Sequence, residues 1–454
     1  MKNIKKVYPS IFKRIIYAGC RQKHFEIILL TFLILVSLFS CVDRNDSISR
    51  TKTQFNITFP NDVNGMQIVK DSIVLRNIST GQTHVWHARN IDLPSGLYDC
   101  SYLADVTYKN GTGADITVSK GHLAGKIENM QITGEEKNID IEAFLSVDNN
   151  DFIFEEIFFT GTLRASGSQY YGDSYIKIYN NTDHVLYADG LGFCESKFKS
   201  TLFFDYKPDI RRDTFTVWSL YVIPGTGHDH PVLPGHSLLI VDTGIDHRLA
   251  NPNSLDFSKA DFEWYDVSIH PAHMDIDSPT VPNLDKWYCY TQSFYVLHNR
   301  GFTSFALCRI PKEITKEQWL KDYLYHYSYV QVNIAGEFHM TQSAYKIPNS
   351  WIIDGVNCSV EAKRLWNILP SSVDAGWTHC GTTDHDKTRY FKSVRRKLLY
   401  LNTDGTMQLK DTNNSTEDFN TECVPSMIEI QKSAIDAQGT KCNQQTYDGI
   451  VPKK

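Results

Sequence analysis

Short runs of alternating apolar and polar residues, separated by turn residues, make up most of the chain from Phe55 to about residue 147. Apolar side chains at every second position are typical of strands with one buried face. The closing run at residues 137–142, KNIDIE, follows this pattern. Strands at such short spacing predict a β-sandwich over residues 55–147.

A second β-rich region is predicted over residues 148–426. In its best-defined strand, Ile176 and Ile178 share one face, and Tyr175 and Lys177 share the other. This alternation is typical of a half-buried strand. The fold class predicted for the whole chain is therefore mainly β, with helices only as insertions.

Two helical insertions are predicted in the second region. Thr315 and Gln318 have the spacing of a capping box, and apolar residues follow at helical intervals. Tyrosines at every second position from 323 to 329 indicate that this helix gives way to an extended segment. A second helix is predicted from Ser359 to Leu369, because a proline ends the run.

The N-terminal 40 residues have the pattern of a secretory signal peptide. Basic residues precede an apolar run at residues 27–40, which is shorter than the roughly 20 residues of a membrane-spanning helix. The sequence LFSC at residues 38–41 resembles a bacterial lipobox, which implies lipidation of Cys41 and a durable membrane anchor. The polar residues 41–54 are predicted to form a tether.

Several segments carry a family resemblance. These are EIFFTGT, YIKIYNNTDHVLYADGLGF, PVLPGHSLLIVDT, NPNSLDFSKADFEWYD and KDTNNSTEDF. Together they resemble the DUF4876 family of uncharacterised Bacteroidetes lipoproteins. Their layout is similar to a lamin-tail domain, which implies an immunoglobulin-like sandwich for residues 148–426. The sequence LPSGLY at residues 93–98 resembles a turn of transthyretin-like and carboxypeptidase-regulatory-like sandwiches. Residues 427–454 are expected to form a polar tail.

Composition limits the function classes. The 454 residues are 41% hydrophobic and 22% charged, which is typical of a folded globular chain, and they allow two to three domains. The formal charge is -6, and without residues 1–40 there are 39 basic residues against 51 acidic ones. This balance gives no general attraction to phosphate backbones, so no nucleic acid partner is expected.

Eight cysteines remain beyond Cys20 in the signal and Cys41 at the anchor. An even number in an exported chain predicts disulfides, although spacing alone leaves many pairings open. Sequence neighbours provide one hypothesis: Cys289 with Cys308, Cys358 with Cys380, and Cys423 with Cys442. The chain has no CxxC pair, which excludes a zinc ribbon or a thioredoxin-type motif.

The densest group of potential metal ligands is His228, His230, His273, Asp275 and Asp277. Imidazole and carboxylate groups suit zinc, and the aspartates could instead bind calcium. Glycines and a proline around the histidines instead favour a polar surface loop. Both interpretations stay open at this point.

No complete catalytic motif is present. Ser237 lies in a sequence like a nucleophile elbow, but Leu239 replaces the glycine that such a turn needs. Glu155 and Glu156 are adjacent on a predicted strand and point to opposite faces, which is a poor geometry for acid–base work on one bond. The basic cluster at residues 395–397 is interpreted as a solvated strand end.

The aromatic content suggests recognition. Aromatic side chains with polar tips are enriched in contact surfaces. The predicted recognition surface consists of Tyr170, Tyr171, Trp264, Tyr265, Trp287 and Tyr288. Packing inside the sandwiches is the competing explanation for these residues.

We therefore expect a non-enzymatic lipoprotein of the outer membrane, and both the cell surface and the periplasmic face stay open as its location. It would act as a binding or accessory module for a protein partner or an extracellular ligand. An outer-membrane β-barrel or TonB-dependent receptor is the expected type of partner. The alternative is a metal-dependent secreted hydrolase, of the nuclease or phosphatase type, that uses the region of His228, His230 and His273.

Overall fold

The structure is a computed structural model. It describes residues 49–59, 65–110, 117–146, 150–268, 270–271, 274–291, 293–370, 372–402 and 405–432. The predicted signal peptide and Cys41 lie outside the described residues. No helix in the described ranges is long and apolar enough to cross a membrane. The fold is mainly β, with 45% strand and 8% helix, which confirms the predicted class.

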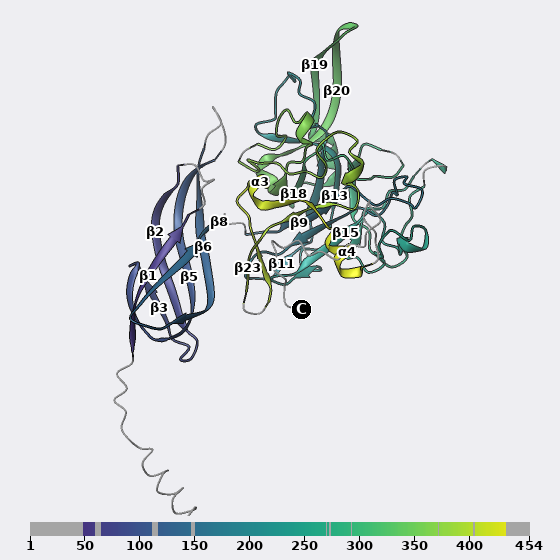
Figure 1. Cartoon of the computed structure of the whole chain (residues 1–454). Coiled ribbons are helices and arrows are strands. Elements are labelled where there is room, and N and C mark those ends of the chain that lie inside the picture. The colour runs from purple at the N-terminus through teal and green to yellow at the C-terminus, as the bar shows by residue number, and fades with distance from the viewer. Residues whose placement is uncertain are drawn as a thin grey trace, which may run out of the picture.

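The N-terminal unit is a β-sandwich, shown in purple and blue in Figure 1. One sheet has the order β4-β1-β7 and the other has the order β3-β2-β5-β6-β8. Apolar side chains from both sheets, such as Phe55 and Tyr102, fill the space between them. The strands are β1 (Arg50–Thr58), β2 (Gln67–Asn77), β3 (Thr83–Trp86), β4 (Asn90–Pro94), β5 (Gly96–Asn110), β6 (Thr117–Ile132), β7 (Glu136–Glu142) and β8 (Phe144–Ser146).

Two local features of this unit bear on the sequence predictions. The expected turn at residues 93–98 joins β4 to β5, and the Tyr98 hydroxyl donates a hydrogen bond of 2.9 Å to the Pro94 carbonyl. The predicted tether is too long, because β1 already begins at Arg50 and pairs with both β4 and β7. Polar residues such as Thr51 and Thr53 are buried there, so polarity alone concealed the strand.

The C-terminal unit is built on two larger sheets. One has the order β16-β15-β10-β9-β22-β25, and the other has the order β19-β20-β13-β12-β18-β21, with β17 also paired to β13. The strands are β9 (Ile153–Phe158), β10 (Tyr175–Tyr179), β11 (Leu186–Tyr187), β12 (Leu191–Ser196), β13 (Thr214–Val222), β14 (Pro231–Val232), β15 (Ser237–Val241), β16 (Phe262–Glu263), β17 (Asp285–Cys289), β18 (Phe305–Arg309), β19 (Leu324–Asn333), β20 (Gly336–Pro348), β21 (Ile352–Val356), β22 (Ser393–Arg396), β23 (Leu398–Leu401), β24 (Met407–Leu409) and β25 (Phe419–Cys423).

The main core lies between these two sheets. It contains Ile176 and Ile178 from β10, Phe193 from β12 and Phe305 from β18. A second apolar cluster covers the other face of the seven-stranded sheet and includes the buried Trp319. The seven-stranded sheet is therefore buried on both faces over much of its area, and its end carries the long hairpin β19–β20 (Figure 1).

The helices are short. They are α2 (Lys316–Asp322), α3 (Ser415–Asp418) and α4 (Ser426–Gln431), with 3-10 turns η2 (His247–Leu249), η4 (Asn349–Trp351), η5 (Glu361–Lys363) and η6 (Lys387–Arg389). The predicted capping box of α2 is confirmed, because the Thr315 and Gln318 side chains each accept from the other residue's backbone N–H. The predicted tail begins too early, because α4 buries Ile428 in an apolar cluster.

The predicted helix at residues 359–369 is wrong. Only the single turn η5 forms there. The backbone N–H of Ser359 donates to the Thr378 carbonyl, and the N–H groups of Ile368 and Leu369 both donate to the side-chain oxygen of Asn357. These tertiary hydrogen bonds take the donors that a helix needs, so the apolar spacing reflects packing of an irregular segment.

The basic cluster at residues 395–397 is not a solvated strand end. Arg396 is completely buried, and its guanidinium contacts Asp354 at 2.7 Å, Asp411 at 3.1 Å and Asp418 at 3.7 Å. It also donates to the Phe154 carbonyl at 2.7 Å. These partners belong to β21, β9, α3 and the segment just before α3, so one side chain links both sheets of the C-terminal unit.

The charges of this cluster depend on one another. Burial raises the pKa of Asp354 and Asp418, and Arg396 opposes both shifts. Burial alone would lower the pKa of Arg396, but the surrounding carboxylates raise it above its ordinary value. Removal of the arginine would leave buried carboxylates without their counter-charge, which is far more costly than loss of a surface ion pair.

We predict that Arg396→Ala lowers the free energy of unfolding by about 3–5 kcal/mol, because it leaves buried charges unpaired. The matched control is Arg248→Ala, which removes a half-exposed arginine that pairs with Asp246 and Asp256. The control should cost far less, because exposed ion pairs contribute little to stability. Denaturant unfolding of both variants measures the difference, and equal losses would contradict the role given to Arg396.

Candidate functional site

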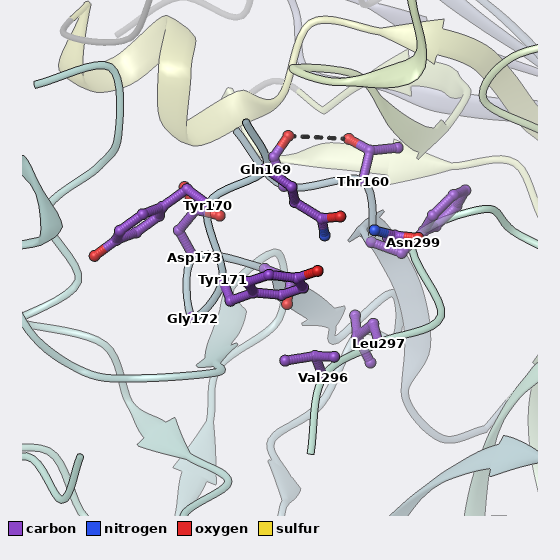
Figure 2. Close-up of a pocket in the computed structure, with 12 residues that line it drawn as sticks. Thr160, Gln169, Tyr170, Tyr171, Gly172, Asp173, Val296, Leu297 and Asn299 are labelled. Carbon is purple, nitrogen blue, oxygen red and sulfur yellow. Dashed lines mark hydrogen bonds between the residues drawn. The ribbon is translucent and has the colours of Figure 1, made fainter. Parts of the chain in front are cut away.

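A pocket opens beside the loop that follows β9 (Figure 2). It leaves only about 10 Å³ for the centre of a water-sized molecule, and it is lined by Thr160, Gln169 and Tyr171 from that loop and by Leu297 and Asn299 from a second loop. A cavity needs about 10–15 Å³ by this measure to hold a single water molecule. The pocket is therefore too small for a metabolite-sized substrate in this conformation.

Tyr170 and Tyr171, two members of the predicted recognition surface, point in opposite directions in Figure 2. The Tyr171 side chain is 54% exposed and lies at the pocket. Tyr170 is buried, and its hydroxyl forms a 3.0 Å hydrogen bond with Nδ1 of His247. Only Tyr171 is available to a ligand.

The groups behind the pocket form a buried polar network. His247 places Nε2 2.9 Å from the Thr243 carbonyl, so Nε2 carries the proton and Nδ1 accepts from Tyr170. Burial lowers the pKa of His247, which keeps the ring neutral. Asp173 accepts hydrogen bonds from the hydroxyls of Thr162 and Ser254. Each of these contacts holds the loop in place, and neither ring nitrogen of His247 is left to act as a base.

The predicted metal ligands do not converge in the described residues. His228 packs edge-on against Tyr187, with ring centroids 4.5 Å apart, and His230 packs against Phe262 at 5.0 Å. The side chain of Asp189 accepts from three backbone N–H groups of the loop that carries both histidines. The loop is therefore organised by a carboxylate and needs no metal to hold its shape.

The predicted aspartate ligands are already engaged. Asp275 accepts from the backbone N–H of Asp266 at 2.9 Å, and Asp277 accepts from the Asn283 amide at 2.9 Å. His273 lies outside the described residues. Among the residues that the structure describes, no group of three or more His, Cys, Asp or Glu side chains is arranged to hold a metal ion.

The other aromatic candidates do not form one surface. Trp264 is 0% exposed and stacks on Phe193 in the main core, so its assignment to a recognition surface is wrong. Trp287 and Tyr288 are half-buried against the second cluster, where Trp287 contacts Trp319. Tyr265 is half-buried on the segment after β16. Packing therefore accounts for most of these side chains.

The expected disulfides are absent from the described part of the chain, where seven cysteines are buried free thiols. The pair Cys289 and Cys308 is wrong, because β13 and β12 lie between β17 and β18. At about 4.8 Å per strand the two Cα atoms are roughly 14 Å apart or more, and a disulfide allows about 7 Å. Cys308 instead contacts Cys194, with 3.8 Å between their sulfur atoms.

The other two disulfide hypotheses end differently. Cys358 and Cys380 both belong to the main core, where they remain unbonded thiols. Cys442 lies outside the described residues, so the pair with Cys423 stays a prediction. Small apolar volume explains the burial of such thiols as well as cross-linking does.

The most distinctive exposed element is the hairpin β19–β20, which extends away from the body of the unit (Figure 1). Its base is anchored by aromatic side chains: Tyr325, Tyr327 and Tyr329 pack in a row beside Tyr206 and Phe204. The alternating tyrosines thus gave a correct strand prediction. They also mark the face by which the hairpin is held.

The outer half of the hairpin is apolar and exposed. Val330 and Val332 share one face, Phe338 lies on the other, and Ile334 is at the turn. Val332 is 73% exposed, and Ile334 is fully exposed. Their exposure cannot be predicted from the sequence, because the same alternation is typical of an ordinary strand in a sandwich.

The outer edge of β19 is only partly covered. The backbone of Ser328 exchanges hydrogen bonds of 2.8 and 2.9 Å with Lys207, and within the described chain β19 has β20 as its only strand neighbour. Because backbone groups alternate in direction along an antiparallel strand, Val330 and Val332 present their N–H and C=O groups to the same side as Ser328. An unpaired edge of this kind is a template for another strand.

Glu195 supports the loop that lines the pocket. It is completely buried, and it accepts from the Tyr295 hydroxyl, from the Thr303 hydroxyl at 2.6 Å and from the His298 backbone N–H at 3.1 Å. Burial raises the pKa of Glu195 to about 6, against the opposing effect of these donors. The loop is thus fixed by a group that titrates in the slightly acidic range.

Comparisons with known proteins agree with the family resemblance. Residues 233–426 match the family described as "Protein of unknown function (DUF4876)". The structure is similar to the crystal structure of a DUF4876 family protein from Bacteroides thetaiotaomicron VPI-5482, with a TM-score of 0.53 and 19% identity, over 86% of this chain and 99% of that chain. At this identity the likeness shows the fold alone. No curated protein matches the sequence.

We predict that Glu195 makes stability fall as pH rises. Its pKa is higher in the folded state than the ordinary value of 4.5, so its contribution is present below pH 4.5 and lost as pH rises through about 6. A shift of that size corresponds to about 2 kcal/mol. Between pH 4 and pH 7.5, the free energy of unfolding should therefore fall by about 2 kcal/mol more in the wild type than in Glu195→Gln. Identical pH profiles would refute this.

Proposed function

We propose that this chain is a non-enzymatic binding module, a lamin-tail-like lipoprotein of the outer membrane that is anchored at Cys41 and holds a protein partner through the hairpin β19–β20. The anchor and the location rest on the signal and lipobox pattern of residues 1–41. The single observation that supports the binding role is the exposed apolar outer half of the hairpin.

The exposure of these side chains is costly without a partner. Val332 and Ile334 together present two large aliphatic groups to water, and full burial of each is worth about 1.5–3 kcal/mol. The hairpin base is fixed by aromatic packing, so little conformational entropy is lost when the outer half is covered. A preformed apolar projection of this kind suits insertion into a groove of another protein.

The chemistry of the hairpin favours a protein over a lipid surface. Residues 324–344 contain no lysine or arginine, and their charged or titratable residues beside the tyrosines are Glu337 and two histidines. Binding to anionic lipid is driven by clustered basic residues. The open edge of β19 supplies backbone donors and acceptors as well, which a partner strand can pair and a bilayer cannot.

Nothing in the described residues favours the metal-dependent hydrolase. The proposed histidines are separated by their own packing contacts, and the pocket in Figure 2 is small. The binding role is therefore the only function we propose.

We predict that Ile334→Asp lowers recovery of the partner at least tenfold when the tagged full chain is purified from native membranes in mild detergent, because it places a charge at the buried centre of the contact. The matched control is Leu249→Asp, which makes the same change at a residue that is 89% exposed on η2. The control should recover the partner as the wild type does. Mass spectrometry of the co-purified proteins is the measurement.

A second variant tests the strand edge. Val332→Pro removes a backbone N–H that faces outward and leaves the hydrogen bonds between β19 and β20 intact. Loss of the partner with this variant indicates strand pairing, and retention indicates side-chain contacts alone. Equal recovery with Ile334→Asp and Leu249→Asp would sink the proposed function.

A further inference from the structure

Two lysines just after β12 lie half-buried without an acidic partner. Lys197 and Lys199 flank Phe198, which is buried under the hairpin base. Among the described residues, neither ammonium group has a carboxylate within 4.0 Å, although most other partly buried basic side chains of this unit do. The two side chains therefore leave positive charge unbalanced at one place.

Aromatic rings fix the position of the first lysine. The Lys197 ammonium lies 3.9 Å from the centroid of the Trp218 ring, and Tyr290 stacks on Trp218 with 3.8 Å between ring centroids. Cation–π contact holds the charge in place without neutralising it. The Tyr290 side chain is 46% exposed, so its ring remains accessible beside the lysines.

The neighbouring charges reinforce the excess. Arg300 acts on Lys199 electrostatically, and it is paired with Asp384, which it shares with Lys363. Glu195 also acts on Lys199, but its two oxygens already accept from Tyr295, Thr303 and His298. The region thus holds more cationic groups than anionic ones.

The pKa values agree with this geometry. Burial lowers the pKa of Lys197, and Lys199 lowers it further. Burial also lowers the pKa of Lys199, as does Arg300, against the opposing effect of Glu195. A lowered pKa is typical of a partly buried cation that lacks a counter-ion. A bound anion would provide that counter-ion.

We propose that Lys197 and Lys199 form a binding site for an oxyanion, the sulfate, phosphate or carboxylate group of a ligand, beside the exposed ring of Tyr290. The site is independent of the proposed hairpin contact, since it uses other residues and another type of ligand. The mechanism is charge-assisted hydrogen bonding from two ammonium groups, one of which is held in place by Trp218.

The test is isothermal titration calorimetry, in which the full chain is titrated with sodium sulfate, sodium phosphate and sodium acetate at constant ionic strength. At least one of the three should bind to the wild type. Lys199→Met and Lys197→Met, which keep most of the side-chain volume, should each weaken that binding at least tenfold. Lys207→Met is the control, because it removes an exposed lysine that pairs with Asp205, and it should leave the affinity unchanged.

Each outcome decides the proposal. Preference among the three anions identifies the group that the site selects. If none of the three anions binds to the folded wild type, the proposal is wrong. It is also wrong if the Lys197 and Lys199 variants bind the anion as tightly as the Lys207 control does. Thermal unfolding of each variant confirms that it is folded before the titration.

Discussion

The relative position of the two large sheets in the C-terminal unit depends on the buried side chain of Arg396. Its guanidinium lies between the two large sheets, where it bonds to the carbonyl of Phe154 on β9 and to the carboxylate of Asp354 on β21. Asp354 also accepts from the backbone N–H of Phe154 at 2.6 Å. A charge buried this deeply is tolerated only if its hydrogen bonds are made. The cluster therefore sets the relative position of the sheets at that end of the sandwich.

The functional features stand on this scaffold. The hairpin is the end of the seven-stranded sheet. Asp354 on this sheet pairs with Arg396 on the six-stranded sheet, so the ion pair connects the two. A second aromatic cluster then covers the outer face of the sheet and holds the base of β19. The apolar outer half projects from a rigid base, which separates a packed part of the hairpin from a part available for binding. The lysine site lies beyond the end of β12 in the same sheet.

Sequence patterns predicted what local rules determine. Alternation located β10 and β19, and the capping box located α2, because both signals follow from the local period of the backbone. The predictions were wrong where the ion-pair or hydrogen-bond partners of a residue lie elsewhere in the sequence. Arg396 is 42 positions from Asp354, and the helix expected after Ser359 is replaced by bonds to Asn357 and Thr378.

The candidate sites show the same limit. Aromatic side chains stood out in composition, but burial separates Trp264 in the core from Tyr171 at the surface, and a single sequence does not reveal burial. The exposure of the outer half of the hairpin could not be predicted, because apolar residues recur at every second position in exposed strands and in buried strands alike. Its exposure depends on how far β19 and β20 extend beyond the sheet, which is a property of the whole fold (Figure 1).

The most direct test of the central claim is site-specific photo-cross-linking in native membranes. A photoreactive phenylalanine analogue replaces Ile334 at the hairpin turn, and the same analogue at Leu249 serves as the reference position. We predict one dominant protein adduct from position 334 and no adduct with that protein from position 249. Adducts with lipid only, or the same proteins from both positions, would contradict a hairpin that binds a protein partner.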